Sequence, residues 1–266
     1  MNSSGSTVYL FAGDSLTEGT WGECYVERVR QGLAFRCGAA KVATVNAGRG
    51  GDTVRSLGAR IEDVLHQVRP QWLVLAIGSS DAWFHWLGGH SVGWWLRLRI
   101  RALRTGQAET ADLDGFAASY RALIDRSRAV SDAQVVACTI SPLGEVLSSP
   151  LNRQVARLNG AIQCVAAERH VAVADVWQEF VEQLAPERRP SRHLSRAWWS
   201  WALDRRLLGR MTPDQLARRR RLRFTWDGIH LNSRGADLWA ATILQVLSPT
   251  TPMIGKGMQH HHEEPV

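Results

Sequence analysis

This sequence of 266 residues has little lysine, few cysteines and no long apolar run. Only two of its 32 basic residues are lysine, so the other 30 are arginine. The four cysteines show no C-x-x-C spacing, which argues against a zinc motif and predicts plain buried thiols. The longest apolar run, residues 72–77, is far shorter than a bilayer-spanning helix, so we expect no transmembrane segment.

The start of the chain also lacks the features of a signal peptide. No basic residue precedes Arg28, and the apolar run at residues 8–12 is shorter than the core of a signal sequence. The sequence therefore predicts a cytoplasmic location. Apolar residues make up 45% and charged residues 21% of the chain, which is a globular composition and excludes a disordered protein.

The positive charge is concentrated in two segments. Residues 184–224 carry twelve arginines against three acidic residues, a net charge of twelve minus three, or +9. Residues 85–106 add four arginines and no acid, and because the whole chain carries +7, the remainder is mildly acidic. This distribution predicts a possible anionic surface as a partner. No nucleic-acid-binding fold accompanies it, so we do not expect nucleic acid.

Outside these segments, short apolar runs alternate with amphipathic stretches. The runs predict buried strands at residues 8–12, 42–46, 72–77, 135–139 and 171–174. The stretches predict helices at residues 25–35, 54–68, 113–130, 151–168, 175–184 and 233–247. Strands that alternate with helices predict an α/β fold, a three-layer α/β/α sandwich around a parallel sheet. We expect residues 1–247 to form a single domain and residues 248–266 a flexible tail.

The two basic segments, residues 85–106 and 184–224, are expected to be insertions that form a cap. Residues 194–210 have the spacing of an amphipathic helix, and Thr212-Pro213-Asp214-Gln215 is typical of a helix start. Residues 96–101 alternate with period two and fit either a strand or a helix.

Eight of the twelve tryptophans lie in or beside the two insertions. Their rings either face substrate, as sugar-stacking platforms, walls of an acyl pocket or membrane contacts, or they pack the insertions onto each other. On the first alternative, the candidate substrate-binding residues are Trp83, Trp86, Trp198 and Trp226.

A candidate catalytic serine follows the first predicted strand directly. In Gly13-Asp14-Ser15-Leu16 the serine lies at the carboxyl end of a parallel strand, where ligands bind in open α/β sheets, and we expect the next helix near Trp21. A serine hydroxyl needs a base within hydrogen-bond reach to act as a nucleophile. The candidate base is His230, because Asp227 lies three residues earlier and one tight turn would aim its carboxylate at the imidazole Nδ1–H.

Four blocks of sequence stand out, each just after a predicted strand or before the closing helix. They are Gly13-Asp14-Ser15-Leu16, Asn46-Ala47-Gly48-Arg49-Gly50-Gly51-Asp52-Thr53, Gly78-Ser79-Ser80-Asp81 and Asp227-Gly228-Ile229-His230. In content and order they resemble the four blocks of the GDSL, or SGNH, hydrolases. The resemblance covers most of the chain, without the two insertions and the tail. It implies a flavodoxin-like sandwich with a parallel five-stranded sheet, and ester or thioester hydrolysis with no metal and no cofactor.

The resemblance also implies roles for single residues. Ser15 would be the nucleophile, His230 the base and Asp227 its orienting partner, with the Ser15 and Gly51 N–H groups in the oxyanion hole. The family's third oxyanion donor is an asparagine side chain, where this sequence has Ser80. A serine hydroxyl is shorter and rotates more freely than an amide, and loss of one such donor typically lowers kcat about 10²–10³-fold. A shifted register would place the neighbouring serine, residue 79, there instead.

Three functions are compatible with these residues. The first is a serine esterase that cleaves a small-molecule, glycan or lipid acyl ester through an acyl-enzyme on Ser15. The second is an acyltransferase with the same triad, since a mouth lined by tryptophan excludes water. The third, motivated by Ser80 and the +9 segment, is a weakened hydrolase that serves as a binding module for anionic surfaces.

Overall fold

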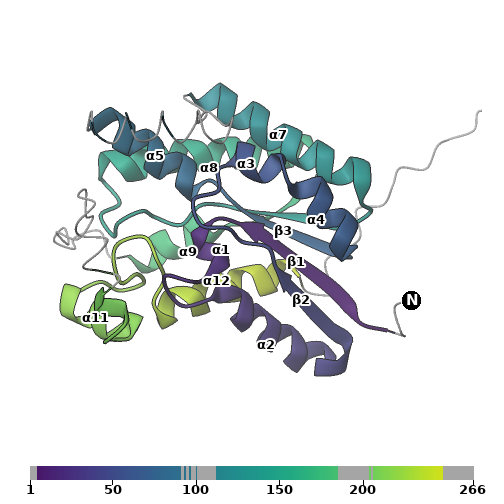
Figure 1. Cartoon of the computed structure of the whole chain (residues 1–266), viewed down its shortest axis with the longest axis horizontal. Helices are drawn as coiled ribbons and strands as arrows, with labels where there is room; N and C mark the ends of the chain where they lie inside the picture. The colour runs from purple at the N-terminus through teal and green to yellow at the C-terminus, as the bar shows by residue number, and fades with distance from the viewer. Residues whose placement is uncertain are drawn as a thin grey trace, which may run out of the picture.

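The computed structural model describes residues 5–90, 93, 96, 100, 112–184, 204 and 206–247. At its centre lies a parallel five-stranded sheet with the order β2-β1-β3-β4-β5 (Figure 1). The strands are β1 (Thr7–Gly13), β2 (Val42–Asn46), β3 (Trp72–Ala76), β4 (Gln134–Cys138) and β5 (Ala172–Ala174). This is the flavodoxin-like order, so the predicted α/β/α sandwich is confirmed.

Helices cover both faces of the sheet because neighbouring strand residues point to opposite sides. On one face Leu10 and Leu75 belong to a core beneath α3 (Val54–Gly58), α4 (Ile61–Val68), α5 (Ser79–His90), α7 (Leu113–Val130) and α8 (Pro150–Glu168). On the other face Phe11 and Val74 belong to a core beneath α2 (Tyr25–Cys37), α9 (Val176–Gln183) and α12 (Ser233–Val246). Figure 1 shows the sheet between these two layers.

Three local predictions were wrong. The helix expected at residues 54–68 is broken between α3 and α4, where Arg60 leaves helical geometry to pair with Asp52 at 2.7 Å. The helix expected near Trp21 instead begins at the serine itself, as α1 (Ser15–Glu18), and α2 follows later. Of the four cysteines only Cys138 is buried, because the others lie on helix surfaces or in loops.

The helix start predicted at Thr212 is confirmed as the beginning of α11 (Pro213–Arg220). The Thr212 hydroxyl accepts the Gln215 N–H at 3.3 Å, and the Gln215 side chain accepts the Thr212 N–H at 2.9 Å. In the other basic segment, positions 93, 96 and 100 are helical. More than half of residues 85–106, about half of residues 184–224 and the expected tail, residues 248–266, lie outside the described residues. Within the described ranges no helix is both long and apolar enough to cross a membrane.

Candidate active site

The carboxyl ends of β1 and β3 lie side by side, with Gly13 paired to Ala76. The strand order reverses between these two strands, and such a switch point is where open α/β sheets bind ligands. From this edge the chain enters α1 after β1 and α5 after β3, so the first and third sequence blocks meet here (Figure 1).

A tight turn at the end of β1 positions Ser15. Asp14 caps α1, its Oδ1 accepting the Leu16 N–H at 3.1 Å. Gly13 has no room for a side chain, because a Cβ there would lie 2.2 Å from both the Ala76 carbonyl oxygen and the Thr17 hydroxyl. A glycine and a capping carboxylate therefore set the direction in which Ser15 leaves the strand.

Ser15, His230 and Asp227 lie in one hydrogen-bonded row. His230 Nε2 is 3.2 Å from Ser15 Oγ, and His230 Nδ1 is 2.7 Å from Asp227 Oδ2. The other carboxylate oxygen accepts the N–H groups of Ile229 at 2.8 Å and of His230 at 2.7 Å, so the Asp227 side chain is held at both oxygens. The structure thus brings these three predicted residues together, although Ser15 and His230 are 215 positions apart.

Asp227 and His230 belong to a short hairpin, residues 225–231, which we call the acid–base hairpin. Thr225 and Leu231 form an antiparallel bridge, and the Trp226 N–H donates to the His230 carbonyl at 3.0 Å. Gly228 at its tip has a φ of 94°, in the left-handed region that favours glycine. The hairpin therefore fixes the spacing that aims Asp227 at the imidazole.

Burial and charge act in opposite directions on this pair. Burial lowers the pKa of His230, but the Asp227 carboxylate, with Asp14 and Asp204 further away, raises it above its ordinary value. Burial raises the pKa of Asp227, but His230 and the Ile229 N–H lower it below its ordinary value. The Asp227 carboxylate therefore stabilises the imidazolium that forms when His230 accepts a proton, as a general base requires.

Asp14 is a fully buried carboxylate beside the candidate nucleophile. Burial raises the pKa of Asp14 to about 6, against the opposing action of Leu16, Ser80, Ser79 and His230. Its Oδ2 makes no hydrogen bond within the part of the chain that the structure describes. The negative charge of Asp14 is therefore costly here, which its place beside Ser15 in the sequence did not predict.

The second and third sequence blocks also lie at this edge. The Arg49 N–H donates to the Gly13 carbonyl at 3.0 Å, and a Cβ on Gly50 would lie 3.9 Å from the Ser15 Cβ. Gly51 follows with a φ of 77°. Ser80 is buried in the first turn of α5 and acts on Asp14 through its backbone. Gly51 and Ser80 therefore come from the two segments that flank Ser15.

The tryptophans proposed to contact substrate are placed differently. Trp83 and Trp86 are buried and stack on each other with ring centroids 5.2 Å apart, and Trp226 is fully buried. In the described conformation these rings belong to the core rather than to an open face. Trp226 instead packs beside His230 at 6.3 Å, as does Trp21 at 6.1 Å. The fourth candidate, Trp198, lies outside the described residues.

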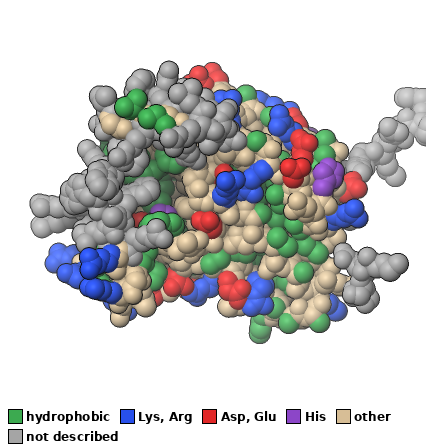
Figure 2. Space-filling view, viewed as in Figure 1, with side chains coloured by type: hydrophobic (Ala, Val, Ile, Leu, Met, Phe, Trp, Pro, Cys, Tyr) green, Lys and Arg blue, Asp and Glu red, His purple; other side chains and the backbone are tan. Residues whose placement is uncertain are grey.

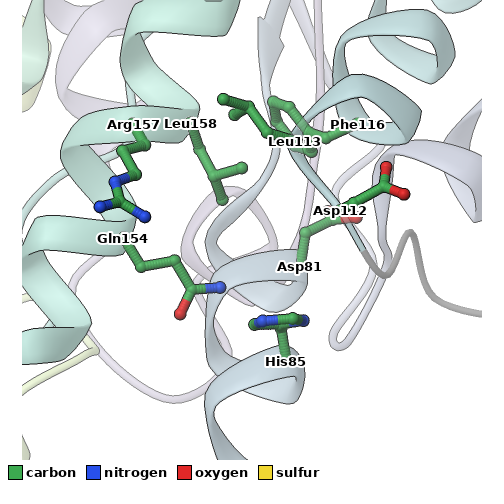
Figure 3. Close-up of a pocket in the computed structure, with 8 residues that line it drawn as sticks. All are labelled: Asp81, His85, Asp112, Leu113, Phe116, Gln154, Arg157 and Leu158. Atoms are coloured by element: carbon green, nitrogen blue, oxygen red, sulfur yellow. The ribbon is translucent and has the colours of Figure 1, made fainter.

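A pocket of about 130 Å³ opens beside the third block, between α5, α8 and the start of α7 (Figure 3). Charged, amide and apolar side chains converge on it: Asp81, His85, Asp112, Leu113, Phe116, Gln154, Arg157 and Leu158. Asp81 directly follows Ser80 along α5. No group of three or more His, Cys, Asp or Glu side chains among the described residues is placed to hold a metal ion.

A parallel α/β/α sandwich with a serine, a histidine and an aspartate in one row at its switch point has the architecture of the SGNH-type carboxylic ester hydrolases. The sequence profile of the GDSL-like Lipase/Acylhydrolase family matches residues 11–238, and the chain belongs to this family. The protein is therefore a carboxylic ester hydrolase.

Solved structures with the same fold include three esterases or hydrolases. Axe2, an acetylxylan esterase from Geobacillus stearothermophilus, has a TM-score of 0.60 and 22% identity over 92% of this chain and 95% of its own. The acetyl xylan esterase AlAXEase has a TM-score of 0.60 and 20% identity over 91% of this chain and 100% of its own. LAE5, an alpha/beta hydrolase enzyme from the metagenome of Lake Arreo, Spain, has a TM-score of 0.59 and 20% identity over 91% of this chain and 95% of its own. No curated protein sequence matches this chain significantly.

Proposed function

We propose that the protein hydrolyses a carboxylic ester through an acyl-enzyme on Ser15. As Ser15 Oγ attacks the ester carbonyl, His230 Nε2 takes its proton, and Asp227 stabilises the imidazolium that forms. The hydrogen-bonded row of these three side chains is the observation that supports this mechanism.

The protons balance over two half-reactions. When the tetrahedral intermediate collapses, His230 returns its proton to the leaving alkoxide, which departs as an alcohol. Water then attacks the Ser15 ester, and His230 takes a proton from this water. His230 gives that proton to Ser15 Oγ as the carboxylic acid leaves.

Variants of a related enzyme support this assignment. Three structures of Axe2 are described as catalytic mutants, in which a serine, an aspartate or a histidine is replaced by alanine. The replaced aspartate lies three positions before the replaced histidine, the spacing of Asp227 and His230 here.

The oxyanion hole is proposed to consist of the Ser15 and Gly51 N–H groups and the Ser80 hydroxyl. If Ser80 donates, Ser80→Ala lowers kcat about tenfold or more, since one donor is lost. Ser80→Asn, which supplies an amide, should retain or raise kcat. Equal kcat values in all three proteins would assign the third donor to another group.

The alcohol half of the substrate is proposed to be polar. The pocket in Figure 3 offers His85, Gln154 and Arg157, which can hydrogen-bond hydroxyl groups over an apolar floor. Axe2 is an acetylxylan esterase, and acetylated xylan is also a hydroxyl-rich ester. The two insertions are proposed to cover this side of the site as a cap.

The first test is hydrolysis of p-nitrophenyl esters from acetate to long chains by wild type and Ser15→Ala. We expect activity in the wild type and loss of about 10⁴-fold or more in the variant, because the serine acts as one unit with His230 and Asp227. Full activity in Ser15→Ala would refute the mechanism. Added sugar or alcohol acceptors that receive the acyl group in preference to water would identify an acyltransferase instead.

A second candidate function, anionic-surface binding, is supported by the basic face around α11. Arg206, Arg210, Arg219 and Arg221 are exposed there, and no ion pair joins them to an acid within the described residues. Figure 2 shows basic side chains gathered over this helix at the lower left. Sedimentation with anionic vesicles should weaken at high salt and in Arg219→Gln. Binding that ignores salt would contradict this function.

A further inference from the structure

Glu145 lies in the loop after β4, and its side chain is buried, with 8% of its surface exposed. Its carboxylate binds the chain at the start of the acid–base hairpin. Its Oε1 accepts the N–H groups of Phe224 at 2.6 Å and of Thr225 at 3.2 Å, and the Thr225 hydroxyl at 3.3 Å. The Arg223 N–H lies 2.8 and 2.7 Å from its two oxygens. One side chain thus satisfies three successive backbone donors on the segment that leads into the hairpin.

The neighbouring residue makes a second contact with the same hairpin. The Gly144 N–H donates to the carbonyl of Gly228 at 2.5 Å, at the tip between Asp227 and His230. Residues 144 and 145 therefore hold the acid–base hairpin both at its entry and at its tip. We call the segment that supplies both contacts, residues 140–149, the support loop.

The support loop is itself anchored to α8. Asn152 Oδ1 accepts the Leu143 N–H at 2.8 Å, and its Nδ2 donates to the carbonyls of Gly144 at 2.8 Å and Val146 at 2.9 Å. Asn152 is fully buried. A continuous set of hydrogen bonds therefore runs from a helix of the sandwich through the support loop to the hairpin that carries His230.

The geometry points to Glu145 as a positioning residue that sets the distance between His230 Nε2 and Ser15 Oγ. This inference rests on the proposed function of these two residues. The two atoms are 3.2 Å apart, at the outer limit of a useful hydrogen bond, so a small shift of the hairpin breaks the contact. A misplacement of about 1 Å in an active site can lower the rate about 10²-fold.

Glu145 acts through its acceptors rather than through its charge. The charged groups that raise the pKa of His230 are Asp227, Asp14 and Asp204, and Glu145 is not among them. Glu145→Gln keeps an oxygen that can stand at the Oε1 position, whereas Glu145→Ala leaves three backbone donors unpaired. The glutamine variant should therefore retain the position of the hairpin, and the alanine variant should not.

The experiment compares Glu145→Ala, Glu145→Gln and Glu145→Asp with wild type, and uses Asp175→Asn as a control. Asp175 also accepts three hydrogen bonds, from Thr139, Gln163 and Gln178, and none of them comes from the hairpin. Circular dichroism and melting temperature report folding. Steady-state kinetics on a soluble p-nitrophenyl ester over a range of pH gives kcat, KM and the acid limb of kcat/KM.

We expect kcat of Glu145→Ala to fall about 10–100-fold with KM changed less than about twofold. Its acid limb should move to lower pH, because a looser Asp227 contact raises the pKa of His230 less. Glu145→Gln should keep at least about a third of kcat. Asp175→Asn should lower the melting temperature but leave kcat and the acid limb of kcat/KM unchanged.

Unchanged kcat and acid limb in a folded Glu145→Ala would overturn the inference, as would a loss in Glu145→Gln as large as in alanine. If Glu145→Ala does not fold, Glu145→Asp decides, since its shorter side chain cannot reach all three donors. A folded aspartate variant with full kcat overturns the inference, and one with reduced kcat supports it. Failure of the proposed function itself is separate, because wild type would then show no hydrolysis that depends on Ser15.

Discussion

The two halves of the candidate site are built in different ways. The turn that carries Ser15 is made by its chain neighbours, with Gly13 leaving the strand and Asp14 capping the helix. The hairpin that carries His230 is held by distant residues, among them Glu145, about 80 positions earlier, and Trp21, whose carbonyl accepts the Trp226 Nε1–H at 2.5 Å. The first half depends on local geometry, and the second on how well the sandwich is assembled.

The largest expected effect is that of Asp227→Asn, which breaks the second half at its centre. Asparagine keeps the size of the side chain but favours the wrong imidazole tautomer, so kcat should fall about 10⁴-fold while KM changes little. Steady-state kinetics with a soluble ester measures this. A loss below about tenfold would mean that the hairpin backbone alone orients His230.

Gly13→Ala breaks the first half, and its main effect should be on stability. A Cβ at 2.2 Å from backbone and side-chain oxygens forces β1 and β3 apart, at a cost of about 3 kcal/mol in the free energy of unfolding. Gly160→Ala in α8 is the matched control, because nothing lies within 4 Å of its Cβ. Denaturant titration should find the control neutral or more stable by about 1 kcal/mol. Equal destabilisation of both variants would contradict the packing argument.

Asp14→Asn tests the charge that the first half buries. The folded pKa of Asp14, about 6, lies above its ordinary value of 3.8, so between these pH values the folded chain holds the extra proton. Stability from this group is therefore present below about pH 4 and lost as the pH rises to 6 and beyond, by about 3 kcal/mol in all.

The asparagine variant has no carboxyl group at this position, so no charge is buried there at any of these pH values. Its free energy of unfolding should therefore rise relative to wild type between pH 4 and pH 8, as measured by denaturant titration at both pH values. Parallel pH curves for the two proteins would show that the buried carboxylate costs nothing.

The smallest expected effect is that of Trp226→Phe in the second half. An aromatic ring is kept, but it is smaller than the fully buried indole, and the hydrogen bond from Nε1 to the Trp21 carbonyl is lost, at a combined cost of about 2 kcal/mol. Activity should fall only a few-fold, because Glu145 still holds the entry to the hairpin. A loss of kcat as large as that of Asp227→Asn would show that the indole, rather than the support loop, positions His230.

The same contrast explains what the sequence predicts well. All five strands were predicted to within one residue at each end, because buried parallel strands are short continuous apolar runs. The Ser15 turn and the Asp227–His230 spacing are local motifs and were equally visible. Glu145 was missed because it lies seven residues beyond β4, in a loop whose course depends on Asn152 and α8. The only available signal was a lone acid after the carboxyl end of a strand.

The tryptophans show the opposite case. Their number and clustering left open whether the rings face substrate or pack inside the protein, and the structure buries Trp83, Trp86 and Trp226. Composition alone does not distinguish a ring that faces solvent from one that fills a core, since large aromatic side chains serve both purposes. The contact of Trp21 with His230 joins two ends of the chain and carried no sequence signal at all.

The distance of 215 positions between Ser15 and His230 has a consequence for how the protein is made. The first strand leaves the ribosome long before the hairpin, which follows only after the strands and helices between them. Contacts that close so long a loop form late, because the entropy of closure must be overcome first. Hydrolytic turnover would then begin only once the sandwich is complete, and its first appearance during refolding would mark the end of the folding reaction.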